Sequence, residues 1–494
     1  MKKELIIAGR KSKLSKAQIN ECVQEFSNHG FPINIKYIET YGDIHTESPI
    51  NQLLITNPFT KEIHQAILDG SVDLGISSLK DVEISETDGI QTVFFSKRQN
   101  PRDVLLLNTN AIEKIQNGEE LIIGTSSTRR KFLFGRIAHK ILPHNPKFSF
   151  KDIRGNITTR ISFLQNSNVD GIILAIAGIQ RLAESEKFCN EITELLTRVR
   201  SIVLPITHFP TPPGQGVVIA QSKTGTQFDR ISKLSNVHSK RVSLLEKQVF
   251  FEYGKGCKEG YGVTHLSYKN HECTFIKGIT SSGIELNIHK NFTKPKFIKL
   301  FDSRKLRPLL KKTPINSTIP SSAKKFIVAN INAVNSQNII DALQNAEEVW
   351  TLGLMTQQKL CEMGIICNGN VETLGISALD EIHFTAGLSP LYKKDCYILT
   401  YQGKTHEKYK TIASYSIKID KTHEKYNSLT QELSQCDAVF WTSCVVYHEF
   451  KAYFQGKTHI TLLGETFDTL ITDGLTPHGI FNFEILDEII KGDA

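Results

Sequence analysis

Short apolar runs alternate along the chain with stretches in which apolar residues recur at helical spacing. At the start, this pattern predicts a strand at residues 5–7, a helix over 15–26 and a second strand at 35–38. The same alternation predicts further elements, namely helices over 59–68, 129–139, 158–164 and 242–253 and strands at 72–76, 122–123, 148–153 and 171–176. Strands that alternate with helices indicate α/β domains with parallel sheets, which bind ligands at the carboxyl ends of their strands.

Two segments interrupt this alternation. Four prolines between 205 and 213 precede Gly214-Gln215-Gly216 and predict a stiff segment that crosses between domains. Residues 294–322 combine basic residues with prolines and predict a connection between modules, after which the alternation resumes at 325. The chain has 494 residues, which is too long for one core, so we expect about three to five domains.

Charge, apolar runs and cysteine content indicate where the protein is located and which partners to expect. The formal charge of +8 is spread along the chain with no run of five like charges, so we expect no nucleic-acid-binding arm. Basic residues end the N-terminal apolar stretch too early for an export signal, and the apolar run at 171–179 is far shorter than the ~20 residues that span a bilayer. Nine cysteines without a Cys-x-x-Cys pair favour a reducing compartment. We therefore expect a cytoplasmic protein without a membrane or nucleic-acid partner.

Two segments place arginines beside small residues whose backbone can approach a ligand. In the first, residues 125–127 (Thr-Ser-Ser) precede Arg129 and Arg130 at the start of a predicted helix, which is a favourable place for an anion. In the second, Arg154 and Arg160 flank a Gly-Asn pair. A guanidinium binds a carboxylate as a planar fork and keeps its charge, so several of them indicate a ligand with many carboxylates. The alternative is that these arginines are ordinary surface residues.

Besides these arginines, the sequence contains a carboxylate and a thiol that are candidates for reactive groups. Asp81 follows Lys80 at the end of a predicted strand, where an aspartate either caps a helix or stabilises positive charge on a substrate. Cys257 is framed by glycines and lies near Lys255 and Lys258, so we expect an exposed loop in which the thiolate is favoured. The other eight cysteines are expected to be inert.

In their order and in their residues, these segments resemble the porphobilinogen deaminase (hydroxymethylbilane synthase) family over about residues 3–300. The resemblance implies a transferase that releases ammonia, with a dipyrromethane cofactor joined to Cys257 through a thioether. It implies that Asp81 is catalytic, because the matching residue binds pyrrole N–H groups and stabilises the cation formed as ammonia leaves. The residues that match cofactor ligands are Lys80, Ser127, Arg129, Arg130 and Arg154. Those that match substrate ligands or their hinge are Arg10, Ser12, Thr125, Ser126, Arg154, Arg160 and Gln215, and no metal is implied.

The chain departs from this family's pattern in three places. Residues 52–58 lack the lysines and the glycines of the family lid. Gly260 and Glu83 stand where proline is usual. We also expect Arg98 and Arg102 to hold the domain together through ion pairs.

The last third of the chain resembles uroporphyrinogen-III synthase. One predicted strand leads to Thr442 and Ser443, and the next leads to Thr466. In the first half of this region, Ala329-Asn330 replaces the usual Thr-Ser turn. The resemblance implies a lyase in which Thr442, Ser443 and Thr466 hold the carboxylates of hydroxymethylbilane. The alternative is a non-catalytic module that serves stability or docking.

Together, the two resemblances imply an α/β fold. A three-domain deaminase, with two periplasmic-binding-protein-like α/β lobes and a small α+β cysteine domain, precedes a two-domain α/β module. The expected boundaries are 1–104 with 202–222 for domain 1, 105–201 for domain 2, 223–300 for domain 3, 301–324 for a linker and 325–494 for the module, with lobes at about 325–415 and 416–494. We expect a bifunctional monomer that acts on porphobilinogen and hydroxymethylbilane. The rival hypothesis, a two-lobed anion-binding protein, gives Cys257 no role.

Overall fold

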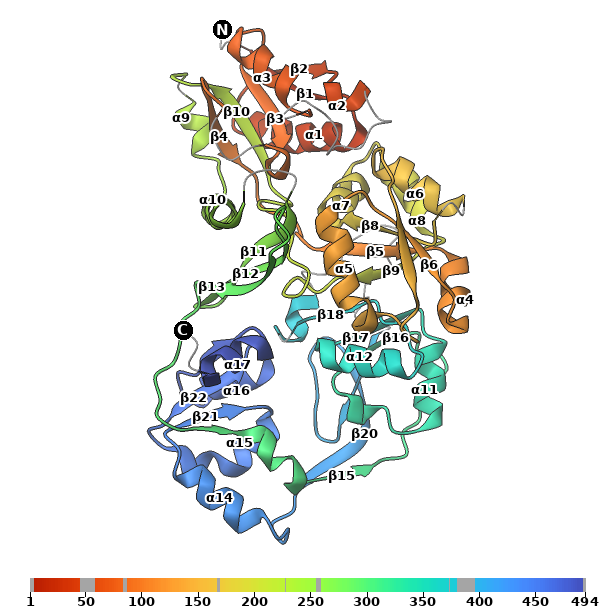
Figure 1. Cartoon of the computed structure of the whole chain (residues 1–494), viewed down its shortest axis with the longest axis vertical. Helices are drawn as coiled ribbons and strands as arrows, with labels where there is room; N and C mark the ends of the chain where they lie inside the picture. The colour runs from red at the N-terminus through yellow and green to blue at the C-terminus, as the bar shows by residue number, and fades with distance from the viewer. Residues whose placement is uncertain are drawn as a thin grey trace.

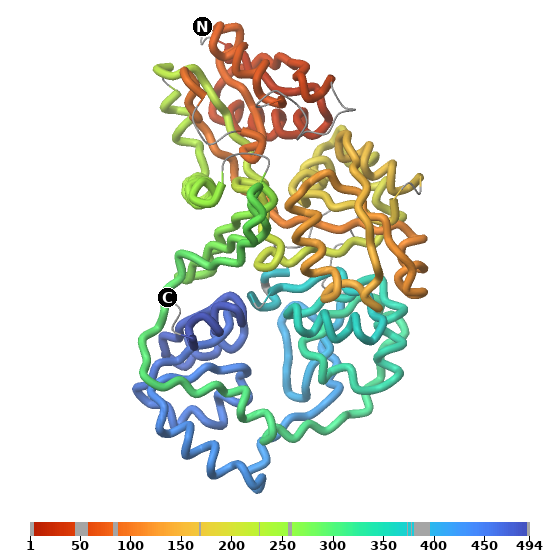
Figure 2. Tube along the Cα trace, in the orientation of Figure 1, coloured from red at the N-terminus to blue at the C-terminus, as the bar shows by residue number. Residues whose placement is uncertain are grey.

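The computed structural model describes residues 4–44, 58–82, 87–166, 169–226, 228–254, 259–372, 374–379 and 396–491. Strands in these ranges form five sheets, of which the two in the C-terminal module lie side by side at the lower end of the molecule (Figure 1). The N-terminal domain lies at the top and the second domain below it on the right. A narrow green sheet then leads down to a C-terminal module of two lobes (Figure 2). Within the described ranges, no helix combines the length and the apolar character needed to cross a membrane.

The N-terminal domain is a five-stranded sheet of order β2-β1-β3-β10-β4. β1, β2 and β3 are parallel, but β10 returns from the second domain and is antiparallel to both of its neighbours, so the expectation of a purely parallel sheet is wrong here. The helix predicted over 15–26 is confirmed as α1. The elements are β1 (Leu5–Arg10), α1 (Lys13–Asn28), β2 (Ile33–Ile38), α2 (Tyr41–Ile44), α3 (Lys61–Leu68), β3 (Leu74–Ser78), η2 (Leu79–Asp81), β4 (Ile90–Phe95), β10 (Val218–Lys223) and α9 (Asp229–Ser232).

The second domain repeats this plan with the order β7-β6-β8-β5-β9. β5 is antiparallel to β8 and β9, whereas β6, β7 and β8 are parallel. The helix predicted over 129–139 is confirmed as α5, whose apolar face, including Phe134 and Ile141, is fully buried against the sheet. The elements are β5 (Asp103–Leu107), α4 (Thr109–Asn117), β6 (Leu121–Gly124), α5 (Thr128–Ile141), β7 (Phe148–Lys151), α6 (Ile157–Gln165), β8 (Gly171–Ala175), α7 (Ile176–Glu184), α8 (Cys189–Leu196) and β9 (Arg200–Val203).

Two connections cross between these domains, one before β5 and one between β9 and β10. They pass so closely at Gly216 that a Cβ atom there would lie 2.4 Å from the Gln99 carbonyl oxygen. The backbone of Gly216 also has a positive φ of 93°, which favours glycine. The proline-rich segment is therefore a tightly packed crossing, as its sequence predicts.

The third domain contains α10 (Val237–Tyr253) and an antiparallel sheet of β11 (Gly260–Tyr268), β12 (His271–Ile279) and β13 (Glu285–Lys290). α10 confirms the helix predicted over 242–253. Phe275 on β12 is fully buried and belongs to a core that also includes Phe481 of the C-terminal module. The third domain and the module are thus packed together.

The C-terminal module has a six-stranded sheet of order β15-β20-β19-β16-β17-β18 and a four-stranded sheet of order β14-β21-β22-β23. The first lobe contains β15 (Leu310–Pro314), β16 (Lys325–Val328), η4 (Ile331–Ala333), α11 (Gln337–Gln344), β17 (Glu348–Thr351), α12 (Leu354–Glu362), β18 (Gly369–Asn370), η5 (Ile376–Ala378), β19 (Cys396–Tyr401) and β20 (Lys410–Ile419). The second lobe contains β14 (Leu300–Asp302), η3 (Ser303–Leu309), α14 (Tyr426–Ser434), β21 (Ala438–Trp441), α15 (Cys444–Phe450), η6 (Lys451–Phe454), β22 (Thr458–Leu462), α16 (Glu465–Thr472), β23 (His478–Ile480) and α17 (Phe483–Lys491).

The segment 301–324, expected to be a linker, instead contributes a strand to each lobe. β14 pairs in parallel with β21, and β15 pairs antiparallel with β20. The expected lobe boundary at 415/416 also falls inside β20. The chain therefore enters the second lobe, crosses to build the first, and returns to complete the second.

Candidate active site

A buried cluster of charges lies at the start of β5 in the second domain. The Asp103 side chain is fully buried and accepts from Arg129 Nη2 at 2.6 Å and from Arg130 Nη2 at 2.8 Å. Arg129 also donates to the Pro210 carbonyl at 2.8 Å, and Arg130 donates to the Ile173 carbonyl at 2.9 Å. These arginines thus lie at a helix N-terminus, as predicted, but they are buried and share one carboxylate.

Gln215 and Lys80 extend this cluster into the first domain. The Gln215 amide donates to Asp103 at 3.1 Å and to the Pro101 carbonyl at 2.6 Å, and its oxygen accepts from Lys80 Nζ at 3.2 Å. Gln215 therefore connects the crossing segment to both domains, which agrees with the hinge role expected for it. Three predicted cofactor ligands, Lys80, Arg129 and Arg130, are thus brought into one network.

Burial and neighbouring charges shift several pKa values in this region. Burial would raise the pKa of Asp103, but Arg130 and Arg129 hold it well below its usual range. Burial lowers the pKa of Lys80, and Arg130 and Arg129 add to that effect. Burial, with Arg130 and Arg154 as positive neighbours, lowers the pKa of Arg160 to about 10. Lys80, Arg129 and Arg130 thus share this region with two carboxylates, Asp103 and Asp81, so the positive side chains outnumber the negative ones.

The predicted hydroxyl groups lie at the carboxyl end of β6. Thr125 is buried, and its hydroxyl accepts from the Ser127 N–H at 3.3 Å. Ser126 donates to the Ile153 carbonyl at 2.8 Å, which joins this turn to the segment that carries Arg154. Ser127 caps α5 by accepting from the Arg130 N–H. The two predicted anion-binding segments thus meet at one edge of the sheet.

Arg154 and Arg160 lie in the second of these segments. Arg160 Nε donates to the Gly155 carbonyl at 2.9 Å, and Asn156 caps α6. Arg154 is partly buried, and burial lowers its pKa. No carboxylate within the described ranges pairs with Arg160, so its charge is available to an anionic ligand.

Arg10 and Ser12 follow β1 in the first domain. Arg10 donates to both Asp43 oxygens, with Nη2 2.5 Å from Oδ1, and lies 4.3 Å from the centre of the Phe59 ring. Ser12 caps α1 by accepting from the Ser15 N–H. Among the residues with described positions, no hydrogen bond or ion pair joins Arg10 or Ser12 to the Asp103 cluster. Their predicted ligand role therefore stays a prediction.

Asp81 is the last residue of η2, directly after β3. The N-cap of this short helix is Ser78, so the structure does not support the alternative in which Asp81 caps a helix here. Within the described part of the chain, the Asp81 carboxylate forms no hydrogen bond, and the side chain is partly exposed. Its carboxylate is thus accessible beside Lys80.

Some predicted features lie outside the described residues. They are Cys257 with its flanking lysines, Glu83, and residues 52–57 of the lid segment. Gly260, by contrast, is buried at the start of β11, where a Cβ atom would lie 2.8 Å from the Ile279 carbonyl oxygen.

Two structural roles were missed or only outlined by sequence reasoning. Asp103 is the carboxylate that organises the arginines, and its position directly after Arg102 at a strand start was the available signal. Gln18 on α1 donates to Ser78 at 2.8 Å beside η2, and nothing in the local sequence marked it. Arg98 and Arg102 do form ion pairs, at 2.7 Å with Glu246 of the third domain and at 3.5 Å with Glu372 of the C-terminal module. These pairs join different parts of the chain, whereas we expected them to hold one domain together.

The predicted residues of the C-terminal module also follow strand ends. Thr442 follows β21, and its N–H donates to Ser303 Oγ at 3.0 Å. Ser443 caps α15, and Thr466 lies in the first turn of α16. Ser303, which sequence reasoning missed, is buried at the end of β14.

The donors around Asp103 fit a ligand with several carboxylates, such as dipyrromethane. Arg129 Nε is buried and has no hydrogen-bond partner within the described ranges. Burial lowers the pKa of Arg160 most and the positive charges of Arg130 and Arg154 add to that effect, so an anionic ligand would stabilise the charged guanidinium. Within the described part of the chain, no group of His, Cys, Asp or Glu has the arrangement of a metal site.

Comparisons with known proteins identify the family. A family model described as "Porphobilinogen deaminase, dipyromethane cofactor binding domain" matches residues 5–228. The porphobilinogen deaminases of Francisella tularensis subsp. holarctica (strain OSU18) and subsp. novicida (strain U112) are each 31% identical over 284 residues, which covers 57% of this chain and 87% of each relative. Among solved structures, a substrate-binding protein of a polar amino acid ABC uptake transporter from Streptococcus thermophilus aligns with 47% of this chain and 78% of that chain, at a TM-score of 0.26 and 13% identity. The chain belongs to the porphobilinogen deaminase family, and its N-terminal half is a porphobilinogen deaminase with a dipyrromethane cofactor-binding domain.

Proposed function

We propose that the N-terminal half joins four porphobilinogens head to tail, with release of ammonia at each addition, and that its cofactor is attached to Cys257. The observation that carries this proposal is the excess of cations around Asp103. When bound, dipyrromethane supplies the covalent primer to which pyrroles are added. Family membership favours this enzyme over the anion-binding hypothesis.

The cations and hydroxyls have a binding role in this proposal. Arg129, Arg130 and Lys80 would hold cofactor carboxylates, since charge-assisted pairs are strong in buried surroundings. Arg154 and Ser127 would also hold the cofactor. Thr125, Ser126 and Arg160 of the second domain would hold the substrate, together with Arg10 and Ser12 of the first domain. Gln215 of the crossing segment would position it.

Asp81 has the catalytic role. Its carboxylate would accept a hydrogen bond from the pyrrole N–H of porphobilinogen. As the C–N bond to the leaving amine breaks, positive charge develops on the pyrrole, and a fixed carboxylate stabilises that charge. Ammonia leaves with the electron pair of the broken bond, after protonation of the amine.

A mass experiment tests this assignment. The intact mass of the protein should exceed the sequence mass by one dipyrromethane, and addition of porphobilinogen should produce a ladder of heavier species. Arg160→Ala should halt the ladder at a definite length. Lys131→Ala is the matched control, because Lys131 is a cation of α5 that pairs with Asp152 at the surface, at 2.6 Å. A complete ladder in Arg160→Ala would contradict the binding role of Arg160.

We propose further that the C-terminal module closes hydroxymethylbilane with inversion of one ring. The supporting observation is that hydroxyls gather at the strand ends of the second lobe: Ser303 and Thr442 lie 3.1 Å apart, and Thr466 lies 3.7 Å from the Cys444 sulfur. Lys404 of the first lobe forms an ion pair with Glu465, next to Thr466 of the second lobe. Hydroxyls and backbone N–H groups there could hold substrate carboxylates.

The isomer formed by the full chain tests this second proposal. Porphobilinogen should be converted mainly to the type III uroporphyrinogen, whereas unassisted closure gives type I. A chain that yields only type I contains a non-catalytic module, whose role is then docking on the deaminase. That alternative is favoured by the shared core of Phe275 and Phe481.

A further inference from the structure

The C-terminal module is joined to the second domain through hydrogen bonds that backbone carbonyls accept. The Val203 N–H at the end of β9 donates to the Asn368 carbonyl at 2.8 Å, and the Asn368 amide donates to the Ser201 carbonyl at 3.1 Å. Arg200 donates to the Ile366 carbonyl at 3.1 Å. The short strand β18 of the module thus lies beside β9, as Figure 1 shows below the second domain.

Directly after β18, one carboxylate of the module is buried against the deaminase crossing. Glu372 is only 5% exposed. One of its oxygens accepts from the Thr207 N–H at 2.7 Å and from the Thr207 hydroxyl at 2.8 Å. The other oxygen lies 3.5 Å from Arg102 Nη2. Arg102 and Thr207 are themselves buried, so this contact is shielded from solvent.

The backbone of Glu372 supports the view that this contact is specific. Its φ is +50°, a region that non-glycine residues seldom adopt and retain only where surrounding contacts hold them. The Glu372 N–H donates to Asn370 Oδ1 at 2.9 Å, and Asn370 in turn donates to Gln357 at 2.7 Å. The carboxylate is therefore presented by a braced turn of the module.

The two residues that Glu372 contacts belong to the two segments that hold Arg129. Arg102 directly precedes Asp103, which accepts from both arginines. Thr207 lies in the turn that leads to Pro210, whose carbonyl accepts from Arg129. A shift of Glu372 would therefore displace both acceptors of the Arg129 guanidinium.

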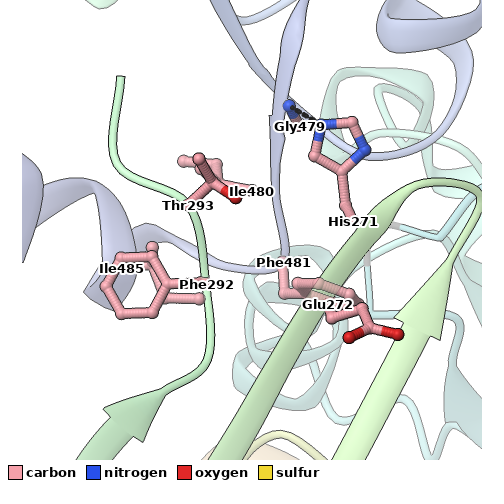
Figure 3. Close-up of a pocket in the computed structure, with 8 residues that line it drawn as sticks. All are labelled: His271, Glu272, Phe292, Thr293, Gly479, Ile480, Phe481 and Ile485. Carbon is pink, nitrogen blue, oxygen red and sulfur yellow. Dashed lines mark hydrogen bonds between the residues drawn. The ribbon is translucent and has the colours of Figure 1, made fainter. Parts of the chain in front are cut away.

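The other lobe of the module holds the same crossing from a second side. His208, next to Thr207, lies 3.7 Å from Glu484 of α17. Glu484 also forms an ion pair with Lys277 of β12. At the start of β12, His271 accepts from the Gly479 N–H at 2.9 Å beside a pocket that residues of the third domain and of the module line together (Figure 3). Both lobes therefore brace the crossing.

We propose that Glu372 is a positioning residue of the deaminase, through which the C-terminal module fixes Arg102, Thr207 and thereby the arginines around Asp103. The proposal rests on the ligand role proposed above for Arg129 and Arg130. It gives the module a task in the first reaction, whether or not the module has an activity of its own.

Glu372→Gln in the full chain is the direct test. The amide keeps an oxygen for Thr207 but removes the charge that faces Arg102. We expect kcat of the deaminase, per cofactor-loaded molecule, to fall roughly tenfold, because small displacements of positioned groups are costly in rate. We also expect one covalent intermediate to accumulate in the mass ladder. Thr207→Val, which removes only a hydroxyl, should cause a smaller change in the same direction.

Asp468→Asn is the matched control, because Asp468 forms an ion pair between the module and Lys269 of the third domain. Within the described ranges it forms no hydrogen bond or ion pair with Arg102 or Thr207, so its loss should leave the ladder normal. The proposal is overturned if Glu372→Gln lowers thermal stability or yield while kcat and the ladder of loaded molecules stay normal. Arg130→Ala distinguishes the ligand role of the arginines from the positioning role of Glu372. A normal ladder in that variant refutes the ligand role. An impaired Arg130→Ala beside a normal Glu372→Gln refutes only the positioning role.

Discussion

Asp103 binds Arg130 through both of its carboxylate oxygens, with Oδ1 2.8 Å from Nη2 and Oδ2 3.2 Å from Nε. Arg129 shares Oδ2 at 2.6 Å. Two guanidinium groups therefore depend on one buried carboxylate. An arginine assigned to ligand binding is here also part of the core of its domain.

Of the four predicted arginines, Arg129 and Arg130 are bound to Asp103, whereas Arg154 and Arg160 are not. Arg130→Ala should lower the free energy of unfolding by about 3 kcal/mol, because it leaves Asp103 with one partner fewer in a buried site. Arg160→Ala should leave stability nearly unchanged but weaken ligand binding by roughly 1.5–3 kcal/mol. Urea unfolding of cofactor-free protein and the mass ladder measure the two effects. Equal losses of stability in both variants would contradict the distinction.

Asp81→Asn should retain its cofactor once loaded and slow turnover by ~10²–10³, since the amide cannot stabilise the developing positive charge. Steady-state assays on protein of verified mass measure the change. Asp88→Asn, in the turn before β4, serves as a control for loss of a nearby carboxylate. Near-normal turnover in Asp81→Asn would remove Asp81 from the mechanism.

Cys257→Ser should fold but carry no covalent cofactor and no deaminase activity. A hydroxyl at this position is a far weaker nucleophile than a thiolate at neutral pH. Intact-mass measurement reads the outcome directly. Cys189→Ser, at a partly exposed cysteine on α8, should keep both mass and activity. Persistence of the added mass in Cys257→Ser would show that another residue carries the cofactor.

The contact between the module and the crossing should weaken in acid. Burial, with Lys277 nearby, lowers the pKa of His208 to about 3. An unfolded histidine has a pKa of about 6.5, so between these values the unfolded chain binds more protons and stability rises with pH. Stability should therefore be lost as pH falls from about 6.5 toward 3.

His208→Gln isolates this contribution from that of other groups, including Glu484, whose lowered pKa also makes acid destabilising. The variant should lose less stability than the unchanged protein between pH 7 and pH 5, as measured by urea midpoints. An identical pH dependence in both proteins would assign the effect to other residues.

If the module is a synthase, Thr466→Val should lower the fraction of type III product and raise type I without slowing consumption of porphobilinogen. Chromatography of the oxidised porphyrins measures the ratio. Thr472→Val, at the other end of α16, is the control. An unchanged ratio in Thr466→Val would remove this hydroxyl from the site.

Local pattern was enough to predict helices such as α1 and α5, because each carries an apolar face long enough to show its period. β14 could not be predicted in this way, since it has three residues and its partner β21 is distant in sequence. Thr125 and Arg154 follow the carboxyl ends of β6 and β7, which are parallel neighbours, so both residues lie at one edge of the sheet. The shared use of Asp103, by contrast, could not be predicted from strand order, because its partners come from other elements and meet only on folding.

The pairing of β14 with β21 has a consequence for how the chain is made. Leu300 must wait for Ala438 to leave the ribosome before their strands can join, so the second lobe closes only after the whole first lobe has been translated. Until then, Phe275 of the finished deaminase lacks its cover from Phe481. Nascent chains halted before α17 should therefore expose an apolar surface to chaperones and proteases, although every residue of the deaminase has already been translated.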